Sequence, residues 1–150
     1  MYKALLSLVI ALLFSNSAWA QSARYEIVSS EVESTNIVIL QIKTYCQDKD
    51  AVDAEAQCAA IRATIFDGIP NTKFHKPLLT DGEKTMINKY PSYFNGLYAD
   101  RYTDFIANYK MLSKFKKADK NKSTLYEIKV KVLPLRKDLE QNNIKKQFGL

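Results

Sequence analysis

Few residues of this 150-residue chain have the types and spacing that catalysis requires. His75 is the only histidine, and the stretch from Thr72 to Lys76 offers neither a paired carboxylate nor a nucleophile at a recognisable spacing. The sequence also shows no nucleotide-binding loop and no cluster with metal-ligand spacing. We therefore expect no catalytic residues, no metal and no cofactor, and we predict that the protein is not an enzyme.

Four acidic residues gather around the start of a predicted helix: Asp48, Asp50, Asp53 and Glu55. The group lacks the glycine and the terminal acid of a calcium-binding loop. Negative side chains at a helix start are stabilised by the helix dipole, so capping explains them better than metal binding. Asp50 is then the expected N-cap, and Asp53 takes the place of a capping-box acid.

The first twenty residues have the three parts of a secretory signal. Lys3 forms a short positive region, an apolar stretch runs from Ala4 to Phe14, and Ala18-Trp19-Ala20 is a small-x-small cleavage site. That apolar stretch is too short to cross a bilayer core of about 30 Å. We predict a periplasmic or secreted protein, cleaved between Ala20 and Gln21, with no transmembrane span; an uncleaved signal anchor is the alternative.

Export bears on the only two cysteines, because thiols in an oxidising compartment usually pair. Cys46 continues the even-numbered apolar face of a predicted strand, and Cys58 shares a helical stripe with Ala54, Ile61 and Ile65. Both side chains are therefore expected to point inward. We predict a disulfide between Cys46 and Cys58, adding roughly 3 kcal/mol on the chain-entropy model. The alternative is two buried free thiols.

Seven aromatic residues crowd into the segment from Tyr90 to Tyr109. Rings so close together suit a platform for a sugar or a peptide, and they suit a core stripe equally well. We favour packing between a helix and the sheet. The alternative is an aromatic groove formed by Tyr93, Phe94, Tyr98 and Tyr102.

Charge is uneven along a chain whose formal net charge is +6. Residues 110–150 hold twelve Lys or Arg against four Asp or Glu, whereas residues 21–109 hold nine against twelve. A basic end can steer an acidic polymer, a lipid headgroup or an acidic protein. Lysines also keep a hairpin soluble and protect an exposed edge strand, which is the simpler interpretation. The candidate partner-binding face comprises Lys114, Lys117, Lys129 and Lys131. We expect no nucleic-acid partner, because export removes the usual one and no recognition motif is visible.

Periodicity indicates the elements that must position these side chains. The predicted order is two strands (24–33 and 35–45), an Ala-rich helix (50–66), an excursion (71–90) with a short helix, a helix from Pro91, a hairpin (105–115 and 123–133) and a terminal helix. We therefore expect a signal peptide at 1–20 and a single α+β domain at 21–150. Its antiparallel sheet of about four strands would be covered on one face by helices, in the order β-β-α-α-β-β-α.

Two stretches carry a resemblance to a known group: DAEAQCAAIRATIFDGI and, later, DFIANYKMLSKFKKADKNKSTLYEIKVKVLPLRKDLEQNNI. Their pattern resembles that of the N-terminal domain of the flagellar assembly protein FlgT and related exported lipoprotein-like modules. The shared features are an Ala-rich helix opening with DA, a strand with Tyr126, Ile128 and Val130, and an LxxxL helix at Leu135 and Leu139. The C-terminal sequence, residues 125–150, also resembles that of uncharacterised exported proteins of Bacteroidota-type bacteria.

The resemblance covers about two-thirds of the mature chain, and the cysteine pair and the 71–90 excursion depart from the pattern. It implies a small exported module for attachment and assembly, with no catalytic residues to transfer. We therefore expect a non-enzymatic interaction or assembly module of the bacterial envelope, which binds an envelope protein or an acidic polymer or headgroup. The alternative is a periplasmic domain that binds a small ligand or a glycan, and a hydrolase ranks third.

Overall fold

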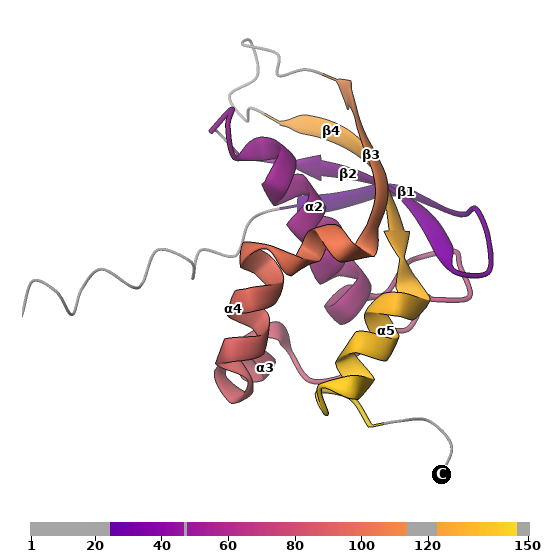
Figure 1. Ribbon diagram of the computed structural model, residues 1–150. Coiled ribbons are helices and arrows are strands. Elements are labelled where there is room, and N and C mark those ends of the chain that lie inside the picture. The colour runs from indigo at the N-terminus through magenta and orange to yellow at the C-terminus, as the bar shows by residue number, and fades with distance from the viewer. Residues whose placement is uncertain (1–24, 47, 114–122, 147–150) are drawn as a thin grey trace, which may run out of the picture.

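The computed structural model describes residues 25–46, 48–113 and 123–146, so the predicted signal peptide at 1–20 lies outside the described residues. The predicted α+β fold is confirmed: four antiparallel strands form one sheet in the order β1-β2-β4-β3, with helices over one face (Figure 1). In chain order the elements are β1 (Tyr25–Val32), β2 (Ile37–Thr44), α2 (Val52–Arg62), the π-helical turn η1 (Ala63–Asp67), α3 (Glu83–Lys89), α4 (Pro91–Ala99), the 3₁₀ turn η2 (Arg101–Phe105), β3 (Ile106–Ser113), β4 (Thr124–Lys131) and α5 (Val132–Gln141).

The two central strands, β2 and β4, supply the middle of the core. Side chains alternate between the faces of a strand, so each strand buries every second residue beneath the helices. Three apolar residues of β2 stand opposite three of β4 and are fully buried: Val38 with Val130, Leu40 with Ile128, and Ile42 with Tyr126. The even-numbered apolar face predicted for the strand before Cys46, which is β2, is therefore confirmed.

Helix α2 lies against these central strands (Figure 1), as its small residues allow. Its most buried positions are Ala56, Ala59, Ala60 and Ile61. The predicted inward stripe is confirmed at Ile61 and Ile65 but is wrong at Ala54 and Cys58, which are only half-buried. Cys58 therefore lies at the margin of the buried face.

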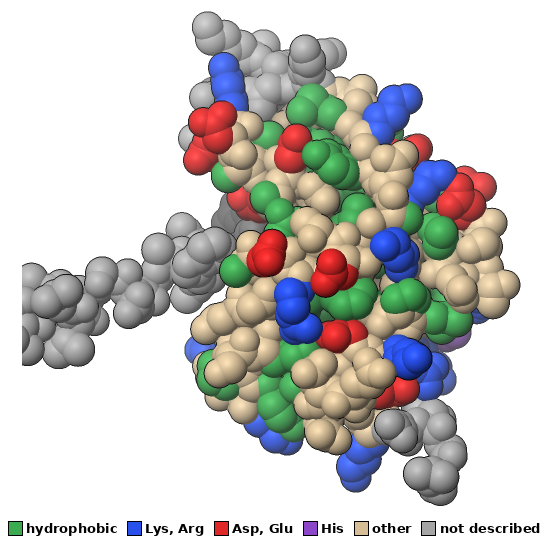
Figure 2. Space-filling view, in the orientation of Figure 1, with side chains coloured by type: hydrophobic (Ala, Val, Ile, Leu, Met, Phe, Trp, Pro, Cys, Tyr) green, Lys and Arg blue, Asp and Glu red, His purple; other side chains and the backbone are tan. Residues whose placement is uncertain are grey.

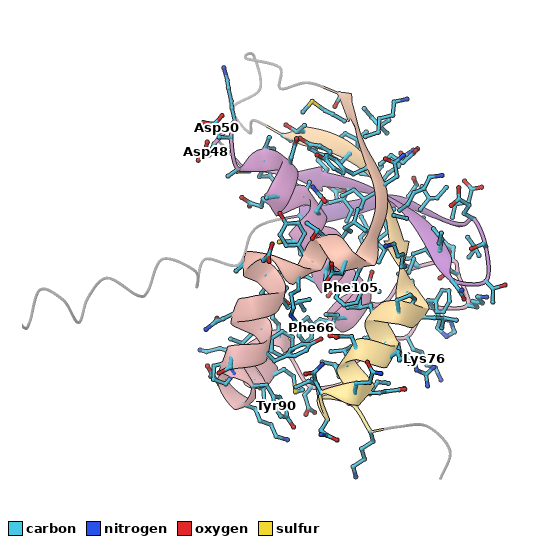
Figure 3. All side chains as sticks on the ribbon, viewed as in Figure 1. Asp48, Asp50, Phe66, Lys76, Tyr90 and Phe105 are labelled. Carbon is cyan, nitrogen blue, oxygen red and sulfur yellow. The ribbon has the colours of Figure 1, made fainter. Side chains whose placement is uncertain are left out.

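The predicted N-cap at Asp50 is wrong. The cap position is Ala51, in helical conformation and without a side-chain cap, while the Asp50 N–H donates to Oδ1 of Asp48 at 2.9 Å. Figure 3 shows Asp48 and Asp50 beyond the start of α2, at the outer end of the helix. The carboxylate of Asp53 accepts a hydrogen bond from the Tyr126 hydroxyl instead, which ties the first turn of α2 to β4.

Gly68 ends the helical segment, with φ at +77°. A Cβ atom there would overlap the carbonyl oxygen of His75, so only glycine fits. The excursion that follows is anchored to the core, because Leu78 and Leu79 are buried and the Leu79 N–H donates to the Ile65 carbonyl at 2.9 Å.

The remaining helices close the core at the end of the sheet (Figure 1). Pro91 occupies the first turn of α4, as predicted. Helix α5 begins at Val132, inside the range 123–133 that was predicted to be a strand, and buries Leu135 and Leu139. Figure 3 shows Phe66 and Phe105 directed into the space between α4, α5 and the sheet.

Candidate functional site

The edge strand β3 (Ile106–Ser113) carries the largest group of exposed apolar side chains on one described element. Tyr109, Met111 and Leu112 are 43%, 38% and 39% exposed. An exposed edge presents backbone groups that can pair with another chain, and apolar side chains beside it favour such contact. We call these three residues and the strand that bears them the β3 edge.

The opposite edge strand, β1, is held by the segment that follows α2. The Ser30 hydroxyl donates to the Pro70 carbonyl, and the Tyr25 hydroxyl donates to Oδ2 of Asp67 at 2.5 Å. Burial, with that bond as a second cause, raises the pKa of the Tyr25 hydroxyl above its ordinary value. The two edges of the sheet therefore differ: two side chains of β1 are bonded to the segment after α2, although Val28 and Val32 are 51% and 39% exposed, whereas β3 carries three exposed apolar side chains.

Only the middle of β3 pairs regularly with β4. Register shifts lie between Ile106 and Asn108 and between Met111 and Ser113, so the regular stretch runs from Asn108 to Met111. Within it, the Tyr109 N–H donates to Oδ1 of Asn108 at 2.9 Å. A side chain of the strand itself, and not β4, thus accepts from this backbone donor.

The lysines predicted to form a basic partner face are only partly described, because Lys114 and Lys117 lie outside the described residues. Lys129 and Lys131 share the helix-free face of the sheet, as predicted, but both have partners within the chain. The Lys129 ammonium pairs with Glu33, and the Lys131 ammonium donates to the Asp104 carbonyl at 2.8 Å.

Acidic and basic side chains are mixed on the molecular surface. Figure 2 shows Lys and Arg interspersed with Asp and Glu on the face that carries the helices. The described surface in that view therefore has no large patch of one sign, and the basic partner face stays a prediction that depends on Lys114 and Lys117.

The predicted aromatic groove does not form an open platform, because two of its four rings are in the core. Phe94 is fully buried and Tyr98 is 9% exposed, whereas Tyr93 and Tyr102 are half-buried. The ring of Phe94 packs edge-to-face on Tyr93, with centroids 5.1 Å apart, and also contacts Phe66 at 5.8 Å. The favoured interpretation, core packing, describes Phe94 and Tyr98.

The polar ends of these tyrosines join helices to one another. The Tyr93 hydroxyl donates to Oδ2 of Asp138 at 2.7 Å, and Arg101 lies over the Tyr93 ring while its guanidinium meets Oδ1 of Asp138 at 3.4 Å. Burial and the Asp138 bond raise the pKa of the Tyr93 hydroxyl. These contacts link α4, η2 and α5 to one another, and each oxygen of the Asp138 carboxylate has a partner.

A second cluster joins α2 to α3. Nε of Arg62 lies 3.0 Å from Oε1 of Glu83, as an ion pair without the angle of a hydrogen bond, and the Arg62 guanidinium stacks over the Tyr98 ring at 4.6 Å. The opposite charges of Arg62 and Glu83 offset one another, although the buried Nε of Arg62 has no hydrogen-bond partner among the described residues.

The disulfide predicted between Cys46 and Cys58 is not formed, and both cysteines are free and half-buried. Sγ of Cys46 approaches the Asp48 carbonyl at 3.5 Å, whereas Sγ of Cys58 approaches the Tyr98 carbonyl in α4 at 3.6 Å. Cys46 lies beyond the end of β2, so strand alternation no longer directs it. Cys58 faces α4 instead of the strand, and the alternative of two free thiols describes the structure.

A shallow groove of about 490 Å³ lies where the junction of α3 and α4 meets the end of α5. Its lining combines two rings with polar groups: Tyr90 and Tyr93 together with Lys89, Ser92 and Asn142. Figure 3 places Tyr90 at the outer end of α4. Rings beside amide and hydroxyl groups are the chemistry that binds a sugar. Tyr93 is the one predicted groove residue that lines it.

His75 has a structural position in the described loop. Its backbone N–H donates to the Thr72 carbonyl at 3.2 Å, and its ring Nδ1 lies 3.2 Å from the same oxygen.

Within the described ranges, no three His, Cys, Asp or Glu side chains come together as metal ligands. None of the helices described in residues 25–146 is long and apolar enough to cross a membrane.

Comparison of the chain with protein-family models, with curated proteins and with solved structures found no match. The resemblance to the FlgT N-terminal domain therefore stays a prediction from the sequence pattern.

The β3 edge was missed by reasoning from the sequence. The signal was present in Tyr109, Lys110, Met111 and Leu112, where three apolar residues in four break the alternation of a half-buried strand. Such a pattern indicates an exposed edge only when the order of strands is known. That order depends on tertiary pairing.

Proposed function

We propose that the protein is an exported, non-enzymatic interaction module of the bacterial envelope, and that the β3 edge binds a protein partner. The observation that carries this proposal is the exposure of Tyr109, Met111 and Leu112 together on an edge strand, while two side chains of the other edge strand are bonded to the segment after α2. The secretory signal supports the export half of the proposal.

A second candidate function is glycan binding at the groove between α4 and α5. Tyr90 and Tyr93 supply rings, and Asn142 and Ser92 supply hydrogen-bonding groups. The two candidates use different surfaces. Variants on one surface therefore leave the other intact, and a single set of proteins distinguishes them.

The test captures binding proteins from envelope extracts of the source cell with the mature chain immobilised. The variant Met111→Lys puts a charge into the β3 edge, and Val28→Lys is its matched control because Val28 is 51% exposed on the other edge strand. We expect the wild type and Val28→Lys to recover the same defined protein, and Met111→Lys to recover at least tenfold less.

A glycan array serves as the second arm. Capture of no protein above that of blank resin would contradict the proposal. Binding to a defined glycan that is lost in Tyr90→Ala and retained in Met111→Lys would establish the alternative.

A further inference from the structure

We propose that the partner binds by strand addition: an extended segment of another protein, apolar at alternate positions and carrying an acidic residue, pairs with Asn108–Met111 of β3. This inference rests on the proposed function and specifies how the partner is held. It is drawn from the strand order, the register of β3 and the exposure of its side chains.

The backbone of β3 offers a donor for such pairing. In an antiparallel sheet, alternate residues direct their N–H and C=O groups toward opposite sides of the strand. The Tyr109 N–H donates to the side chain of Asn108, which indicates that this donor faces the free edge. By alternation, the backbone groups of Met111 face the same way. An incoming strand replaces the Asn108 contact with backbone hydrogen bonds.

The side chains of β3 indicate which residues the incoming strand carries. Tyr109 and Met111 pair with Ile128 and Tyr126, so they lie on the helix-covered face of the sheet, where they are exposed beyond the helices. Adjacent side chains on neighbouring strands interact directly. The added strand therefore places apolar residues on this face, next to Tyr109 and Met111.

The charge of Lys110 indicates which kind of residue the added strand carries on its other face. Lys110 is the only charged residue of Asn108–Met111 and lies on the helix-free face opposite Glu127. The next lysine on that face, Lys129, is already paired with Glu33. An acidic residue on the added strand would flank Lys110 from its other side, which is a favourable cross-strand pair.

The same charge argues against a second copy of this chain as the occupant. Pairing β3 with β3 about a two-fold axis at Lys110, the centre of an alignment that pairs Tyr109 with Met111 of the other copy, brings the two Lys110 side chains together, and like charges on adjacent strands are destabilising. Each mature copy, residues 21–150, also carries a formal net charge of +5, from 21 Lys or Arg and 16 Asp or Glu. A different chain with acidic residues avoids both repulsions.

The test selects peptides from a phage-displayed library of random decapeptides on the mature chain, and measures labelled peptides by fluorescence anisotropy. We expect the enriched peptides to alternate apolar residues and to hold at least one Asp or Glu. The variant Tyr109→Pro removes the edge N–H and is tolerated at an edge position; it should weaken binding at least tenfold. Asn108→Ala, which uncovers that N–H, should bind as well or better.

Lys110→Glu keeps the test decisive if the proline variant unfolds, because Lys110 is exposed and its replacement leaves the core unchanged. It should weaken the acidic peptide at least fivefold and favour a peptide with Lys in place of the acid. The proposal is overturned by failure to enrich peptides, by equal binding to wild type and Lys110→Glu, or by sedimentation of the mature chain as a dimer that Tyr109→Pro dissociates.

Envelope capture with Tyr109→Pro separates this inference from the proposed function. Equal capture of one defined protein by the wild type and the folded variant would overturn strand addition and leave the interaction module standing. Capture by neither would overturn both. Loss of capture in the variant, together with the peptide results above, supports both.

Discussion

The two cysteines illustrate how the surroundings of a side chain set its chemistry. Burial, with a bond to Glu55 as a second cause at Cys46, raises the pKa of each thiol from 9.0 to about 11. Since the thiolate is the reactive form, both cysteines are poor nucleophiles at neutral pH.

We expect two free thiols when the mature protein is denatured without reductant, measured with a thiol-specific chromogenic reagent. In the folded protein, alkylation should be slow at pH 8 and accelerate about tenfold per pH unit toward pH 11, because the thiolate fraction rises that way below the pKa. Single variants Cys46→Ser and Cys58→Ser assign the two rates. A count of zero thiols would contradict the structure.

The same shift has a consequence for stability. A thiol with a raised pKa in the folded state favours folding while it is neutral, so its contribution is complete below pH 9 and is lost as the pH rises toward 11.

The hydrogen bond from Tyr93 to Asp138 gives a second prediction about a single side chain. Tyr93→Phe removes a hydroxyl bonded to a half-buried carboxylate at 2.7 Å, so we expect a loss of about 1–2 kcal/mol in the free energy of unfolding. Tyr109→Phe is the matched control, because Tyr109 is exposed, and it should change stability by less than about 0.5 kcal/mol. Urea denaturation measures both, and equal effects of the two substitutions would count against a stabilising role for the bond.

Among the structural elements, the end of the α2–η1 segment depends on one glycine. Gly68→Ala requires a side chain at φ +77° and forces its Cβ into the His75 carbonyl, so we expect a loss of about 2 kcal/mol or more. Gly82→Ala is the control, because a Cβ at Gly82 has no neighbour within 4 Å and φ there is −63°. We expect the two variants to differ clearly in the midpoint of thermal unfolding. Similar midpoints would show that the backbone at His75 moves away from the new side chain without a loss of stability.

The sheet has two unlike edges, and this asymmetry is what the functional proposals use. The contacts of Tyr25 and Ser30 hold β1 to the segment after α2, whereas β3 carries three exposed apolar side chains and pairs regularly with β4 only over Asn108–Met111. The added strand that we propose would extend the sheet only on the β3 side.

For the molecule as a whole, export is predicted from the sequence. We expect the mature protein to begin at Gln21 because Ala18-Trp19-Ala20 forms a cleavage site after the apolar region. Intact-mass measurement of the protein recovered from the periplasm or medium of a secreting bacterial host tests this. As a control, Ala20→Leu removes the small residue at the cleavage site and should slow processing. A recovered chain that retains the first twenty residues would contradict the prediction.

The sequence by itself determined the α+β class and the buried faces of the central strands. Period-two alternation is a local property, so Leu40, Ile42, Tyr126 and Ile128 could be assigned to one face before their partners were known. Likewise, Gly68 marked the end of a helix, because its conformation is set by its own lack of a side chain.

Tertiary structure alone decided what each functional group faces. Cys58 points to α4 because the buried face of α2 centres on Ala56, Ala59 and Ala60, and no local pattern distinguishes neighbouring stripes of an Ala-rich helix. Similarly, Asp53 bonds Tyr126 and Lys129 pairs with Glu33, partners 73 and 96 residues away in sequence. Periodicity specifies which side of an element is buried, but the group across the contact depends on strand order and helix placement, which arise only when distant segments pack together.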